Sequence, residues 1–245
     1  MYKLLLLYFA AVALLLIPNT SAAQAAPPDT SFIQQSVTNA VQSYSEAMGL
    51  QAHIYNGPEY YQPAKPYLTG HQFFGSKNYE PSAVYYDGAW FNNVPLLYDV
   101  MIDEVITTHK ASGYSQMLVK AKLDTFKLHG HTFIHIQNSS AATKTIAPGY
   151  YDLLHNGSIQ VLSQRKKELQ ERATQTGMEG EYNEVDKFYV VKDGVYTQVA
   201  SKVALLKVLR DKKKPLNKYA RANKLKFRKQ RESAIVSIAK HYETL

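Results

Sequence analysis

The histidines of one segment are the first candidates for chemistry. His129, His131 and His135 fall within residues 128–136, where alternating side chains predict a strand with these rings on one face. Residues two apart on a strand lie about 7 Å apart on the same side, which is close enough for two rings to reach one ion. The segment has no Asp or Glu to complete a ligand set, and Gly130 is typical of a bulge that would disturb the alternation. Solvent-facing histidines opposite an aliphatic inner face explain the pattern equally well, so we predict no metal centre and no cofactor.

Three acidic residues are the second candidate. Asp99, Asp103 and Glu104 are close in sequence, and the strict alternation over residues 94–102 places Asp99 and Asp103 on the outer face of a half-buried strand. Paired carboxylates serve glycoside hydrolysis or hold calcium. Solvent-facing acids on a sheet are far commoner, and the sequence lacks G-x-S-x-G, H-E-x-x-H and glycine-rich phosphate motifs. We expect a binding or structural role, with a secreted hydrolase of glycans or peptides as the alternative.

A loop-like stretch, residues 59–77, is rich in aromatic side chains, among them Tyr60, Tyr61 and Tyr67. A tyrosine side chain offers a flat apolar ring and a polar hydroxyl, and it loses little conformational entropy on binding. Such side chains suit the rim of a site that binds sugars or peptides. A long connection pinned to the sheet by its rings is the alternative, and we favour it. Because long loops without regular structure are often functional, the three tyrosines remain binding candidates.

Positive charge is concentrated at the C-terminal end. The chain carries a net charge of +8, yet residues 201–245 hold 14 of the 28 basic and only 3 of the 20 acidic side chains, a balance of +11 against −3 for residues 1–200. This density indicates contact with an anionic envelope component or an acidic protein partner, and a solvated helical face is an equal alternative. The candidate binding residues are Lys212, Lys213, Lys214, Arg228, Lys229 and Arg231.

Residues 1–25 have the layout of a cleavable signal peptide. A short basic start precedes the apolar run at residues 4–17, and Ala23-Gln24-Ala25 is a suitable cleavage site. The run is shorter than the ~20 residues that span a bilayer, so we predict export with cleavage and no later transmembrane segment. The absence of cysteine favours a bacterial envelope or secreted protein, in the periplasm or at the cell surface. Export makes nucleic acid an unsuitable partner.

Turn signals predict an antiparallel sheet. Asp87-Gly88, Asn156-Gly157 and Asp193-Gly194 each separate two strand-like runs, which indicates three hairpins with two-residue turns. Shorter strands are predicted at residues 50–55 and 115–120 and a helical turn at 123–126. Residues 164–172 fit either strand or helix, and residues 173–183 read as a polar loop.

Helical periodicity is confined to the two ends of the mature chain. Residues 32–48 predict an amphipathic helix that packs on the sheet, and residues 202–210, 216–223 and 227–242 predict three basic helices. The expected fold is α+β: a β-meander or open barrel-like sheet with an N-terminal helix and a C-terminal helical subdomain. We divide the chain into a signal peptide (1–25), an antiparallel β domain with its helix (26–200) and a basic three-helix segment (201–245).

A series of short patterns is spaced along the mature chain: Tyr55-Asn56-Gly57, Gly70-His71, Tyr86-Asp87-Gly88, Asn93-Val94, Leu97-Tyr98-Asp99 and the Lys-Asp-Gly-Val-Tyr run at residues 192–196. In these patterns the chain resembles a group of uncharacterised exported β-rich proteins of Gram-negative bacteria. The resemblance covers most of the mature chain and includes the basic helical end. It implies export and a one-piece architecture, and it transfers no catalytic residue.

Overall fold

The computed structural model describes residues 30–48, 53–63, 65–109, 112–137 and 146–245. The chain divides into two compact units, residues 1–37 and residues 38–245. The predicted signal peptide lies outside the described residues. In the described part of the chain, no helix is both long enough and apolar enough to cross a membrane.

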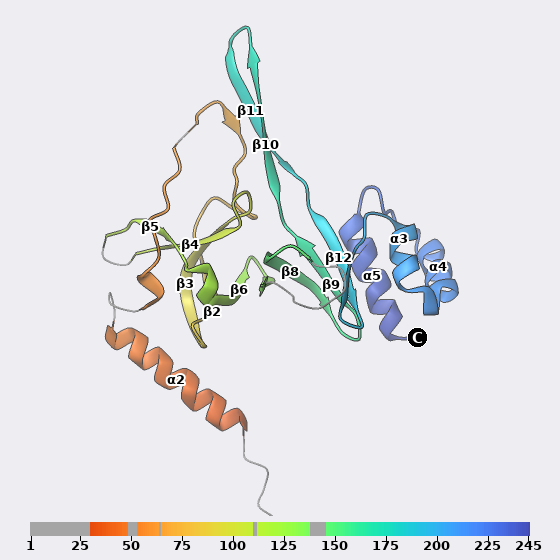
Figure 1. Ribbon diagram of the computed structural model, residues 1–245, viewed down its shortest axis with the longest axis horizontal. Helices are drawn as coiled ribbons and strands as arrows, with labels where there is room; N and C mark the ends of the chain where they lie inside the picture. The colour runs from red at the N-terminus through yellow and green to blue at the C-terminus, as the bar shows by residue number, and fades with distance from the viewer. Residues whose placement is uncertain (1–29, 49–52, 64, 110–111, 138–145) are drawn as a thin grey trace, which may run out of the picture. The chain divides into compact units, whose positions relative to one another are not determined.

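The described elements are mainly strands, with helices at the two ends (Figure 1). The helices are α2 (Thr30–Met48), α3 (Lys202–Val208), α4 (Lys213–Ala222) and α5 (Arg231–Glu243), with short 3₁₀ turns η2 (His53–Tyr55), η3 (Lys120–Lys122) and η4 (Arg210–Lys212). The strands are β1 (Leu68–Thr69), β2 (Glu80–Tyr86), β3 (Ala89–Asp99), β4 (Glu104–Thr108), β5 (Ser115–Met117), β6 (Leu123–Leu128), β7 (His131–Ile136), β8 (Gly149–Asn156), β9 (Gln160–Gln164), β10 (Lys167–Thr174), β11 (Gly177–Glu184), β12 (Lys187–Lys192) and β13 (Val195–Gln198).

Ten strands form one antiparallel sheet in the order β13-β12-β9-β8-β7-β6-β2-β3-β4-β5. Consecutive strands pair in two meanders, β2 to β5 and β6 to β9, and these are joined through the β2–β6 pairing. A second sheet has the order β1-β11-β10, in which only the β1–β11 pair is parallel. The α+β class and the large antiparallel sheet are therefore confirmed.

Two of the predicted tight turns form as expected. At Asp87-Gly88 the strands close with Tyr86 opposite Ala89, and both turn residues have positive φ, 52° and 83°. Asp193-Gly194 repeats this geometry at 52° and 74°. Positive φ at both positions is the signature of a type I′ turn, whose twist matches that of the paired strands. The Asn156-Gly157 turn was predicted one residue too short, because Asn156 pairs with Gln160 and leaves three residues in the loop.

The central strand β3 is buried on both faces, so the prediction of a solvent-facing side is wrong. Leu96 and Tyr98 are fully buried on one face, as expected, while Leu97 is 5% and Asp99 2% exposed on the other. The strand also ends at Asp99 rather than at Ile102, which lies in the turn and is 52% exposed. A sheet with both faces covered requires apolar residues at consecutive positions rather than at every second one.

The C-terminal helices cover one face of the sheet. Consecutive residues of a strand point to opposite faces of the sheet. Val161 and Val190 pack in a core cluster with residues of all three helices, whereas their neighbours Leu162 and Val191 pack in a different cluster. Ser201 caps α3 by accepting a hydrogen bond from the Ala204 amide at 3.2 Å, as its position before the helix predicted. The predicted three-helix segment thus shares its core with strands β9 and β12.

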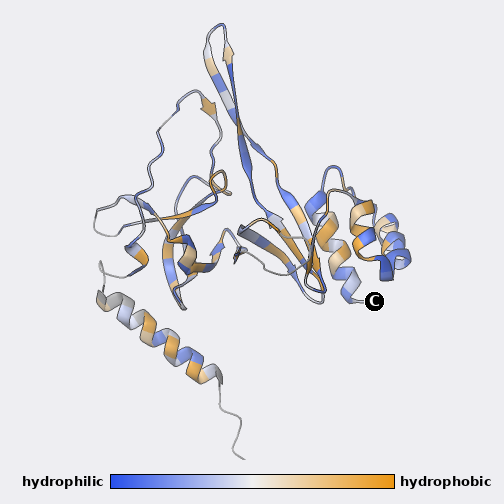
Figure 2. Cartoon of the chain, viewed as in Figure 1, coloured by the Kyte–Doolittle hydropathy of each residue, from blue (hydrophilic) through white to orange (hydrophobic). Residues whose placement is uncertain are grey.

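The hairpin β10–β11 was not predicted as paired strands along its whole length. Sequence favoured a polar loop over residues 173–183, yet Lys167 to Thr174 pair residue by residue with Glu184 to Gly177. The hairpin is long and largely hydrophilic (Figure 2). Because most of its side chains are exposed, no apolar alternation marks it, and cross-strand pairs such as Arg172–Glu179 at 3.0 Å support it instead.

Two short segments adopt a different secondary structure from the one predicted. Residues 53–55, expected as part of a strand, form the 3₁₀ turn η2. Residues 123–126, expected as a helical turn, open strand β6, in which Leu123 and Phe126 are fully buried. The remainder of the predicted strand at residues 50–55 lies outside the described residues.

Helix α2 forms close to its predicted bounds. On the face expected to be buried, Val41 packs against the core cluster of the sheet, as predicted, whereas Tyr44 retains 55% of its surface.

Candidate functional site

The outward face of α4 carries a row of basic side chains. Lys214, Lys218 and Arg221 are exposed and follow the i, i+4, i+7 spacing of one helical face. Leu216 and Ala220, on the opposite face, are 0% and 3% exposed and join the core under the helices. The sequence period thus directs the charges away from the core and into solvent.

The acidic side chains of this segment do not neutralise that row. Asp211 accepts hydrogen bonds from Lys192 of β12 and from the Tyr242 hydroxyl, each at 2.7 Å. These bonds, the one from Lys192 foremost, lower the pKa of Asp211 to about 2. Its charge is therefore already matched by a sheet residue.

The other two acids are engaged in the same way. Glu232 of α5 accepts from Arg165 at 2.6 Å, and Glu243 lies 3.4 Å from His155 Nε2 on β8. All three acids of residues 201–245 are thus paired with groups outside the segment. Across the described residues, none of the segment's 14 Lys and Arg side chains has a carboxylate oxygen within 4.0 Å.

The predicted basic residues divide into two kinds. Lys212 is a structural contact: its Nζ donates to the Tyr242 carbonyl at 3.0 Å and lies 4.2 Å from the centre of that ring. The remaining candidates are exposed on α4, on the α4–α5 connection and at the start of α5, and they are Lys213, Lys214, Arg228, Lys229 and Arg231. Lys218 and Arg221 complete the row on α4 and were not singled out from sequence, although their spacing from Lys214 would have found them.

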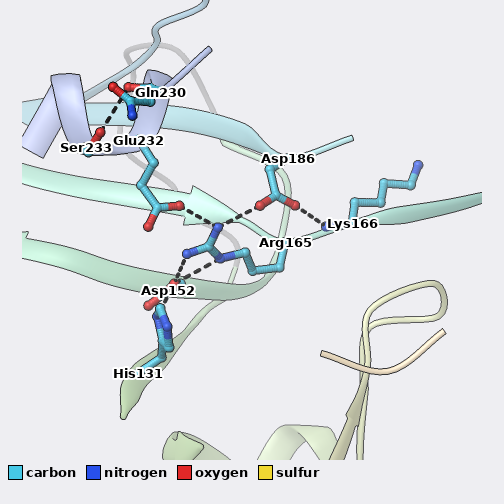
Figure 3. Close-up of polar contacts among 8 residues, drawn as sticks. All are labelled: His131, Asp152, Arg165, Lys166, Asp186, Gln230, Glu232 and Ser233. Carbon is cyan, nitrogen blue, oxygen red and sulfur yellow. Dashed lines mark hydrogen bonds and ion pairs between the residues drawn. The ribbon is translucent and has the colours of Figure 1, made fainter. Parts of the chain in front are cut away.

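A half-buried arginine links the C-terminal helices to the sheet (Figure 3). The Arg165 side chain is 10% exposed and follows the end of β9. Its Nε donates to Asp152 at 2.9 Å, and its Nη1 donates to Asp186 at 2.7 Å as well as to Glu232. One guanidinium thereby joins β8, the β11–β12 connection and α5, a role that suits its planar fork of donors.

Histidine completes this network. His131 Nδ1 lies 2.8 Å from Asp152, whose side chain is fully buried. The hydrogen bond to Asp152 raises the pKa of His131, against the smaller opposing effect of burial. Burial alone would lower the pKa of Arg165, but its hydrogen bonds to Glu232 and Asp186 outweigh that effect and raise it. The cluster is therefore a charged hydrogen-bond network that links β8, the β11–β12 connection and α5.

The three predicted histidines are not brought together. His129 is in the tight turn between β6 and β7, with φ of 50°, and is paired with Glu80. His131 binds Asp152, whereas the His135 ring lies tilted against that of Tyr150, with 4.8 Å between ring centres. The face that they were expected to share is not open to solvent, because Phe133 between them is fully buried. No group of three or more metal-binding side chains occurs within the described ranges.

The acidic pair is separated in the same way. Asp99 is buried and accepts from the Tyr60 hydroxyl at 2.8 Å and from the Met101 amide at 2.9 Å. Burial raises the pKa of Asp99. Asp103 lies in the following turn and accepts from Tyr98 at 2.7 Å and from Lys120 at 3.1 Å. The two carboxylates have different partners, so the expectation of a shared outer face is wrong.

The aromatic loop borders a cavity. Tyr60 and Tyr61 line a pocket of about 440 Å³ together with Tyr182 of β11. Tyr67 does not: it lines a separate cavity against the hairpin and donates to Glu171 at 2.6 Å. Within the part of the chain that the structure describes, no histidine hydrogen-bonds to Asp99, the carboxylate that accepts from the Tyr60 hydroxyl.

Comparison with protein-family models, curated proteins and solved structures gives no match. The resemblance to exported β-rich proteins stays a prediction from sequence.

Proposed function

We propose that this protein is a non-enzymatic binding protein of the bacterial envelope that contacts an anionic polymer or surface through α4 and the α4–α5 connection. The single observation that carries the proposal is the pairing of Asp211, Glu232 and Glu243 with Lys192, Arg165 and His155. Because these acids bind groups outside the segment and none lies within 4.0 Å of its Lys or Arg side chains, no direct ion pair among the described residues offsets the basic row. Export, predicted from the leader, would place the site against envelope phosphates or acidic glycans.

The arrangement of the charges supports a polyanion more than a single small anion. Lys214, Lys218 and Arg221 extend along about two helical turns, and successive side chains of the row are about 5–6 Å apart. Such a row meets charges repeated along a polymer or spread over a surface. A small anion would instead need donors that converge on one point.

The first experiment is retention of the full chain on a heparin column. Reversal of Lys214 and Lys218 to Glu should lower the eluting salt concentration markedly, since the two lie on one face. Reversal of Lys77 and Lys187 to Glu is the matched control, because both are exposed and the change in net charge is the same. We expect the control to elute close to the unmodified protein.

Equal loss of retention in both double variants would refute a localised site, since net charge alone would then explain binding. Elution of the unmodified protein by about 0.1 M salt, where exposed charges are only partly screened, would refute polyanion contact altogether.

A further inference from the structure

The pocket beside Tyr60 is walled by two parts of the chain that are distant in sequence. The loop supplies Tyr60, Tyr61 and Gln72, and the β10–β11 hairpin supplies Tyr182. Parallel pairing of β1 with β11 holds the loop against the hairpin, with Leu68 opposite Gly180. A Cβ on Gly180 would lie 2.6 Å from the end of the Leu68 side chain and 3.0 Å from the Gln170 carbonyl oxygen, so the two strands approach closely here.

The polar groups of the pocket are held in place before any ligand arrives. Gln72 is 8% exposed and donates through Nε2 to the Tyr60 hydroxyl at 3.2 Å and to Gln62. Tyr60 in turn is fixed by its bond to buried Asp99. Orientation of these groups by a buried network lowers the entropic cost of binding.

The lining carries no uncompensated charge. Its charged side chain is Lys65, whose Nζ lies 3.1 Å from Glu171. The uncharged part of the lining includes four aromatic rings and two side-chain amides, from Tyr60, Tyr61, Phe73, Tyr182, Gln62 and Gln72. A ligand that fits this lining is uncharged, has flat C–H faces for the rings and has hydroxyl groups for the amides.

Neutral sugars have these properties, and we propose that the pocket binds a neutral saccharide with a pyranose ring stacked on Tyr61. Tyr61 is 81% exposed at the rim, where it is open to such stacking. A peptide added to the sheet fits less well, because the adjoining edge strand β1 has only two residues to pair with it. The volume of about 440 Å³ lies within the range of small-ligand sites. This site is independent of the basic row on α4.

The test is saturation-transfer NMR on the full chain with cellohexaose, maltohexaose and chitohexaose, and with a blocked, uncharged pentapeptide. We expect transfer to the ring protons of at least one sugar. Tyr61→Ala should weaken its binding about tenfold or more, whereas Tyr61→Phe should bind within about twofold, since the stacking face remains.

Tyr114→Ala is the matched control, because Tyr114 is 65% exposed and does not line the pocket; it should bind as the unmodified protein does. The truncation of exposed Tyr61 should leave the fold intact, which thermal unfolding verifies, and heparin retention should not change. No transfer to any of the three sugars, transfer to the pentapeptide alone, or equal affinity in Tyr61→Ala would overturn the proposal.

Discussion

The sharpest test of the architecture is the removal of Arg165. Its guanidinium is bonded to three carboxylates, and the Asp152 side chain among them is 0% exposed. Truncation to Ala leaves Asp152 buried, with His131 as its remaining ion-pair partner among the described residues. Breaking a buried ion pair by removing one partner costs about 3–5 kcal/mol, because an uncompensated charge remains in the interior.

The same chain offers a control for this prediction. Arg172 pairs with Glu179 on the exposed hairpin, with side chains 76% and 50% exposed. Exposed pairs contribute about 0–1 kcal/mol, so Arg172→Ala should be nearly neutral. For a chain of this size, the loss in Arg165→Ala corresponds to a fall in Tm of about 6–20 °C.

Urea unfolding followed by circular dichroism measures both variants. Arg165→Lys, which keeps the charge but not the fork of donors, should fall between Ala and the unmodified protein. If Arg165→Ala and Arg172→Ala unfold at the same urea concentration, the cluster in Figure 3 does not tie the helices to the sheet.

Two further predictions concern pH. The pKa of His131 is raised above its usual 6.5, so its pairing with Asp152 contributes stability that is complete below about pH 6.5 and is lost as pH rises through the folded-state pKa. His131→Gln should therefore lose less stability between pH 5.5 and 8.5 in urea titrations, and an unchanged loss would contradict this. The pKa of Asp211 is lowered to about 2 by Lys192 and Tyr242, so its contribution is present above about pH 3.8 and is lost as pH falls towards 2. Acid unfolding of Asp211→Asn should show a weaker dependence between pH 4.5 and 2.5; a dependence equal to that of the unmodified chain would refute the pairing.

The features predictable from sequence are those fixed by neighbours along the chain. Asp-Gly at 87–88 and 193–194 supplies the positive φ that a type I′ turn requires, and Ser201 supplies a cap to the first helix amides. Each of these is a local preference that the final packing did not override.

The features that escaped prediction depend on distant partners. Asp99 reads as a surface acid, yet Tyr60, 39 positions away, binds it in the interior. The pairing of Glu232 with Arg165 joins residues 67 positions apart, and no spacing rule indicates it. The hairpin β10–β11 escaped for a different reason: its side chains face water, so the hydrophobic period that marks a strand is missing.

The most direct test of the proposed function is the salt dependence of heparin binding by the full chain. Each cationic contact to a densely charged polymer releases counterions, which adds roughly one unit to the slope of log K against log salt. Reversal of Lys214, Lys218 and Arg221 to Glu should reduce that slope by about three, while the Lys77 and Lys187 control should leave it unchanged. A slope that stays the same in the α4 variant would show that this row of side chains does not contact the polymer.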